Sequence, residues 1–137
     1  MSASYQVNIT LPVGYWLSWY VTAQCCYDQA VKLTDGTAVI FSASKQSTSN
    51  PNFLILTQTK SQSDLHRIAS ISMVLTVQSV ATSTYTPYAY SYTIIDPKTG
   101  NIMGSTYDIF LEDKESDPSA VDFNDVAIHL VALKSSK

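Results

Sequence analysis

Apolar and polar residues alternate with a period of two along much of the chain, most clearly in residues 5–11 and 71–77. Successive side chains of a β-strand point to opposite faces, so this pattern predicts strands with one buried face. Further segments are short and rich in β-branched or aromatic residues, which favour strands. These are residues 15–23, 30–33, 37–43, 53–59, 87–95, 107–111 and 126–133. The sequence therefore predicts nine short strands.

Turn-forming residues separate these segments, as at residues 12–14, 34–36, 47–52 and 96–101. The one helix candidate, residues 63–68, begins with a capping residue, Ser63, but runs directly into the next alternating segment. We expect at most one helical turn there. Strands at this spacing without helices predict an all-β fold, an antiparallel sandwich or barrel. With no repeat or linker in the sequence, we expect residues 1–137 to form a single domain.

The composition narrows the function classes. The chain has 137 residues, 45% of them hydrophobic and 14% charged, which is enough apolar material for one core. Its net charge of −3 argues against nucleic acid or an anionic membrane as a partner. The sequence shows neither a transmembrane stretch nor a signal peptide. We expect a cytoplasmic protein, with release or export without a signal peptide as the alternative.

Acidic residues are concentrated in residues 112–125, which hold Glu112, Asp113, Glu115, Asp117, Asp122 and Asp125. Crowded carboxylates repel one another, so such a segment either stays solvated at the surface or binds a divalent cation. Calcium is the natural candidate because it takes six to eight hard oxygen ligands. The EF-hand is excluded, since its central glycine and final glutamate are missing.

Residues 110–128 resemble the calcium loop of the small bacterial fucose- and mannose-binding lectins. In that family Glu-Asp is followed by Asp-x-Asp-Tyr-Asn-Asp and an apolar strand. Residues 9–24 look like the family's opening strand pair, and residues 37–50 are similar to a central strand and turn. The resemblance implies an antiparallel β-sandwich of about nine strands. It also implies sugar binding through two adjacent calcium ions that coordinate sugar hydroxyls directly.

The resemblance also implies which residues would form the site. The metal ligands would be Gln24, Glu112, Asp113, Asp117, Asp122, Asn124 and Asp125. The sugar would contact Asp122, Asn124 and Asp125 and a specificity loop formed by Cys25, Cys26 and Tyr27. The chain departs from the family where Ala120 replaces an aspartate, where four extra residues lengthen the acidic segment, and where residues 134–137 extend the end. Asp117 would supply the missing carboxylate, and the number of calcium ions stays open.

Aromatic residues point to a surface of a different kind. Tyr88, Tyr90 and Tyr92 recur at every second position of a predicted strand, so they share one face. Three interpretations are open: a stacking platform for sugar rings, a contact surface for a second subunit, or an aromatic ladder half-buried in the sandwich. This face and the low charge content lead us to expect a homo-oligomer.

Catalysis has little support in the sequence. The chain has two histidines, His66 and His129, and no Gly-x-Ser-x-Gly elbow. Neighbouring cysteines such as Cys25 and Cys26 rarely bond to each other, and nothing nearby in the sequence marks either thiol as activated or as a zinc ligand. We therefore expect a non-enzymatic, calcium-dependent carbohydrate-binding protein. The alternative is a structural or self-assembling β-sandwich protein that has lost the metal site.

Overall fold

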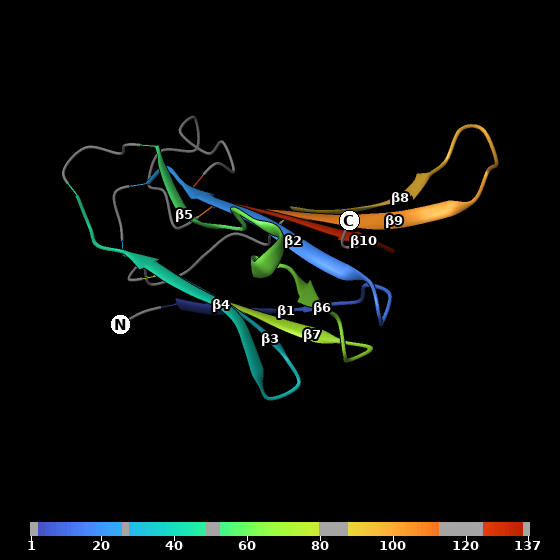
Figure 1. Ribbon diagram of the computed structural model, residues 1–137. Helices are drawn as coiled ribbons and strands as arrows, with labels where there is room; N and C mark the ends of the chain where they lie inside the picture. Colours follow the sequence, from blue (N-terminus) through green and yellow to red (C-terminus); the bar gives the residue numbers. More distant parts are fainter. Residues whose placement is uncertain (1–2, 26–27, 49–52, 80–87, 113–124, 136–137) are drawn as a thin grey trace.

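The computed structural model describes residues 3–25, 28–48, 53–79, 88–112 and 125–135, whose regular structure is almost entirely β (Figure 1). One turn of 3₁₀ helix, η1 (Gln62–Asp64), falls where the sequence predicts at most one helical turn. No helix in this part of the chain is long and apolar enough to cross a membrane. The strands are β1 (Ala3–Ile9), β2 (Trp16–Ala23), β3 (Gln29–Asp35), β4 (Ala38–Lys45), β5 (Leu54–Gln58), β6 (His66–Arg67), β7 (Met73–Ser79), β8 (Tyr88–Ile95), β9 (Ile102–Leu111) and β10 (Val126–Leu133).

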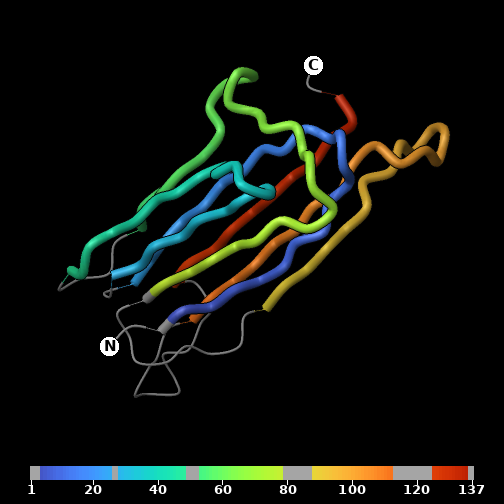
Figure 2. The backbone as a smooth tube through the Cα atoms, turned by 90° about the horizontal axis from the view of Figure 1, so that it is seen from below, coloured from blue at the N-terminus to red at the C-terminus, as the bar shows by residue number. Residues whose placement is uncertain are grey.

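The strands form two antiparallel sheets that face each other as layers (Figure 1). A four-stranded sheet has the order β1-β7-β3-β4, and a six-stranded sheet has the order β5-β2-β10-β9-β8, with β6 paired to β2. Viewed from below, the four-stranded sheet overlies the second layer, and the strands of the two layers run in similar directions (Figure 2). The predicted all-β antiparallel sandwich is confirmed.

The core lies between the sheets and follows the alternation of the sequence. The six-stranded sheet contributes Ile109, Ile128 and Leu130, each 0% exposed, and the four-stranded sheet contributes Leu33 and Leu75, also 0% exposed. An aromatic contact also joins the layers, because the ring centroids of Trp19 in β2 and Phe41 in β4 are 5.5 Å apart. Burial of these side chains, at roughly 1.5–3 kcal/mol each, is the main force that holds the sandwich together.

Strand β9 begins at Ile102, five residues before the predicted start at residue 107. Residues 102–106 include Gly104 and two hydroxyl side chains, so they lack a strand pattern. Strand pairing accounts for the extension, because Gly104 is opposite Ile94 of β8 and Leu133 of β10. A Cβ atom at this glycine would lie 2.3 Å from the carbonyl oxygen of Ala132, so the neighbouring backbone leaves no space for a larger residue.

Candidate functional site

The ends of β2, β9 and β10 bring three predicted metal ligands together at one end of the six-stranded sheet. Val126 pairs with Ala23 on one side and with Leu111 on the other. Gln24 follows the end of β2, Glu112 follows the end of β9, and Asp125 precedes the start of β10, so the three residues lie just beyond three adjacent strands. A backbone hydrogen bond from the Gln24 N–H to the Asp125 carbonyl oxygen, at 3.0 Å, continues the pairing. We call these three residues the acidic edge.

The two carboxylates of the acidic edge are buried, with Glu112 2% and Asp125 8% exposed. Carboxylates buried to this degree are costly unless a cation or hydrogen bonds compensate their charge. Carboxylate and amide oxygens are hard donors of the kind that calcium prefers, so the acidic edge fits calcium in its chemistry. Within the described ranges no three His, Cys, Asp or Glu side chains form a metal-binding group. The other predicted ligands, Asp113, Asp117, Asp122 and Asn124, lie outside the described residues.

The predicted specificity loop begins at Cys25, whose side chain is buried at 4% exposure. Its carbonyl oxygen accepts a hydrogen bond of 2.8 Å from the Nζ atom of Lys45. Cys26 and Tyr27 lie outside the described residues. The structure thus places one of the three loop residues, next to Gln24 of the acidic edge.

Lys45 is a residue of this region that the sequence interpretation missed. It is only 8% exposed, unusual for a lysine, and its ammonium lies beside the residue that follows Gln24. The available signal was its position, because Lys45 continues the inward alternation of Phe41 and Ala43 at the end of β4. A lysine at an inward position requires a buried partner, here a backbone carbonyl.

The first histidine, His66, forms an ion pair with Asp35, which is the last residue of β3. Its Nε2 atom lies 2.7 Å from Asp35 Oδ2, which also accepts a 2.7 Å hydrogen bond from the Ala69 N–H. Burial raises the pKa of Asp35, but hydrogen bonds from His66, Ala69 and Ser70 and the charge of His66 outweigh it, so the pKa lies below its usual value. Because β3 and β6 belong to different sheets, this pair joins the two layers.

The second histidine, His129, lies on the outer face of the six-stranded sheet, with Nδ1 3.0 Å from Asp108 Oδ1. Aromatic rings flank it on that face. The tyrosines predicted to share a face are solvent-exposed, with Tyr88 54%, Tyr90 48% and Tyr92 57% exposed. About half of each tyrosine is therefore accessible to solvent on this outer face, and Tyr90 also contacts Phe110 of the neighbouring strand.

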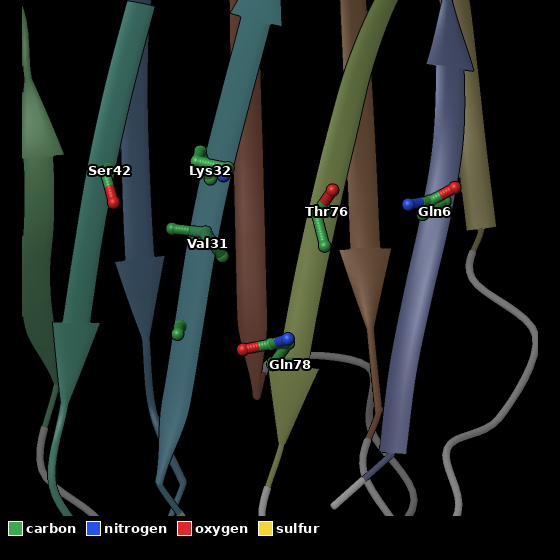
Figure 3. A pocket seen from close by; sticks show the side chains of 7 residues that line it. Gln6, Val31, Lys32, Ser42, Thr76 and Gln78 are labelled. Atoms are coloured by element: carbon green, nitrogen blue, oxygen red, sulfur yellow. The ribbon is translucent and has the colours of Figure 1, made fainter. Parts of the chain in front are cut away.

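A separate hollow of about 360 Å³ lies on the outer face of the four-stranded sheet (Figure 3). Its lining includes uncharged polar side chains and one cation, Lys32, but no carboxylate. These side chains do not match a calcium site. The hollow is formed by strands of the four-stranded sheet, whereas the acidic edge belongs to the six-stranded sheet. It is lined by Gln6, Ala30, Val31, Lys32, Ser42, Thr76 and Gln78.

This chain is similar to known proteins in its three-dimensional structure. No protein-family model matches the sequence, and neither does any curated protein. A lectin from Chromobacterium violaceum, solved in complex with alpha-methyl-fucoside, matches with a TM-score of 0.59 at 14% identity, covering 90% of this chain and 93% of the lectin. A high-affinity mannose-binding lectin from Ralstonia solanacearum matches with a TM-score of 0.59 at 15% identity, with the same coverage.

A third similar structure is the C-terminal domain of a lectin from Burkholderia cenocepacia. It has a TM-score of 0.61 at 13% identity and covers 94% of this chain and 97% of that domain. The likeness spans nearly the whole length of each chain, so it concerns the complete sandwich. The predicted likeness to small bacterial lectins is confirmed for the fold, and the chain has the fold of these three bacterial lectins.

Proposed function

We propose that this protein is a calcium-dependent carbohydrate-binding protein. The observation that supports the proposal best is the acidic edge, where strand pairing brings Gln24, Glu112 and Asp125 together. All three are ligands implied by the resemblance, and the fold is that of bacterial proteins that bind fucoside or mannose. The proposed activity is binding without catalysis.

In this proposal Glu112 and Asp125 supply carboxylate oxygens and Gln24 an amide oxygen. Further oxygens would come from Asp113, Asp117, Asp122 and Asn124. A bound calcium ion offers coordination positions to neighbouring hydroxyl groups of a sugar. The remaining sugar contacts would come from Asp122, Asn124 and Asp125 and from the loop of Cys25, Cys26 and Tyr27, which would set the choice of sugar.

A glycan array probed with and without calcium tests this function. Binding of a defined set of glycans in calcium, lost after a chelator is added, supports the proposal. Glycan binding that persists after the chelator is added contradicts the role of calcium. An array on which no glycan is bound contradicts carbohydrate binding itself. A homo-oligomer would present several such sites together and raise the avidity of weak sugar binding. Light scattering at micromolar concentration measures that state.

Lys45 favours a second candidate function. Its buried ammonium lies beside Cys25, at the end of the sheet where the acidic edge is located. A fixed cation in this region would compensate carboxylate charge without any metal. The chain would then be a structural or self-assembling β-sandwich protein that has lost its metal site. An unfolding temperature that is the same with calcium and with chelator distinguishes this candidate from the first.

A further inference from the structure

Strand pairing aligns aromatic side chains in rows across the outer face of the six-stranded sheet. Ile109 and Ile128 point into the core, so their strand neighbours point outward. One row runs through Tyr90, Asp108, His129 and Tyr20, on β8, β9, β10 and β2. The adjacent row toward the acidic edge contains Tyr88 and Phe110, and the adjacent row on the other side contains Tyr92.

The rings of these rows form one continuous set of contacts. Ring centroids are 6.5 Å apart for Tyr92 and Tyr90, 6.1 Å for Tyr90 and Phe110, 5.7 Å for Phe110 and His129, and 6.0 Å for His129 and Tyr20. The first and last pairs are stacked, and the two middle pairs meet edge to face. We call these five residues the aromatic strip. Such contacts fix the rings in place, so a ligand would meet a preformed surface.

The charge of the aromatic strip selects the kind of ligand. The charged side chains in its rows are Asp108 and His129, which are paired with each other at 3.0 Å. Apart from this pair, the strip consists of uncharged aromatic side chains, which suit an uncharged ligand. The C–H face of a sugar ring packs on an aromatic face, whose negative partial charge attracts those hydrogens. Asp108 and His129 would accept or donate hydrogen bonds to sugar hydroxyls.

The size of the strip argues against a second copy of this chain as the occupant. Tyr20, Tyr90 and Tyr92 of the strip and the neighbouring Tyr88 are 37–57% exposed. At about 200 Å² per aromatic side chain, they offer roughly 400 Å². A stable protein interface buries about 800 Å² on each partner. The strip is therefore too small to hold a dimer by itself, but large enough for a few sugar rings.

The aromatic strip is also continuous with the acidic edge. Phe110 lies two residues before Glu112, and His129 lies four residues after Asp125. At about 3.3 Å per residue, four residues of strand span about 13 Å. We propose that the aromatic strip is an extended subsite that stacks the inner units of an uncharged oligosaccharide whose terminal sugar occupies the acidic edge. This inference rests on the proposed function.

Calorimetric titration with methyl α-mannoside and with linear α-mannopentaose, both in calcium, tests this subsite. The pentasaccharide should bind at least about tenfold more tightly than the methyl glycoside. Tyr90→Ala should reduce that advantage to about twofold and leave methyl mannoside binding unchanged. Tyr90→Phe, which keeps the ring, should retain most of it. Val39→Ala, at an exposed apolar residue of the other sheet, is the matched control and should behave like the parent.

Three results would overturn the inference. Equal affinities of the two sugars for the parent protein would remove the subsite and leave the calcium site standing. Binding of neither sugar would count against the subsite and against the proposed function together. A loss of oligomeric mass in Tyr90→Ala, measured by light scattering, would assign the strip to a subunit contact instead.

Discussion

The backbone N–H of Gln24 donates a 3.0 Å hydrogen bond to the carbonyl oxygen of Asp125. This bond joins residues from distant parts of the chain and extends the pairing of β2 with β10 beyond Ala23 and Val126. It holds two predicted oxygen ligands at fixed positions on adjacent strands. Such preorganisation lowers the cost of assembling a metal site.

Replacing Asp125 by Asn keeps the shape of the side chain but removes its negative charge. If Asp125 is a ligand, Asp125→Asn should weaken calcium binding at least about tenfold, because a carboxylate oxygen and its charge are lost together. Glu112→Gln should act in the same way. Calorimetric titration with calcium measures both.

The matched control is Glu115→Ala, an acidic residue of the same segment that the resemblance does not place among the ligands and that lies outside the described residues. An ordinary surface substitution changes stability by about 0.5 kcal/mol or less. Equal calcium responses in Asp125→Asn, Glu112→Gln and Glu115→Ala would show that the carboxylates do not coordinate the ion.

Calcium should also stabilise the folded protein. An ion that binds only the native state at 100 times its Kd adds about 2.7 kcal/mol to the free energy of unfolding. Thermal unfolding followed by circular dichroism should therefore show a melting temperature several degrees higher in calcium than in chelator. Identical melting curves would favour the metal-free sandwich in which Lys45 supplies the positive charge.

The Asp35–His66 pair should make stability sensitive to acid. The pKa of Asp35 is lowered in the folded state, so its stabilising contribution is present above the unfolded-state pKa and is lost as the pH falls through the folded-state pKa. At pH 7, Asp35→Asn should cost about 1–3 kcal/mol, because the partners of the carboxylate lose a charged acceptor. Urea unfolding of both proteins from pH 7 to pH 3 measures this. A parent protein whose acid sensitivity equals that of the variant would exclude the role of Asp35.

Gly104→Ala should destabilise the sheet by about 2–3 kcal/mol, since the new Cβ atom would lie 2.3 Å from the Ala132 carbonyl oxygen and force β9 and β10 apart. Gly100→Asn is the control. Its Cβ atom meets nothing within 4 Å, and asparagine tolerates the positive φ of 74° found there. Urea unfolding of the two variants should therefore give clearly different losses, and similar losses would show that the backbone of β10 yields easily.

The sequence predicts strands well where burial alone determines the pattern. Strand β10 has the bounds predicted for it, residues 126–133, because its inward positions are all apolar. The sequence does not predict the first half of β9. Gly104 fits the narrow space beside the backbone of β10, and it does not contribute to an alternation of apolar and polar residues. Strand β6 is not predicted either, because two residues are too few to show alternation.

The sequence likewise predicts some residues of the candidate site but not how they are arranged. The motif resemblance names Glu112 and Asp125, but only the pairing of β9 with β10 and of β10 with β2 brings them beside each other and beside Gln24. The Asp108–His129 pair likewise depends on register, because the two residues are opposite each other on adjacent strands. Contacts between distant segments are set by the folded sheet, which the local pattern does not encode.

Retention on immobilised sugar tests the central claim most directly. The parent protein and Asp125→Asn would be passed over mannose-agarose and fucose-agarose in calcium and then washed with chelator. We predict that the parent is retained on at least one resin in calcium and released by the chelator, whereas Asp125→Asn passes through. Retention of both proteins regardless of calcium, or of neither protein, would contradict calcium-dependent sugar binding at the acidic edge.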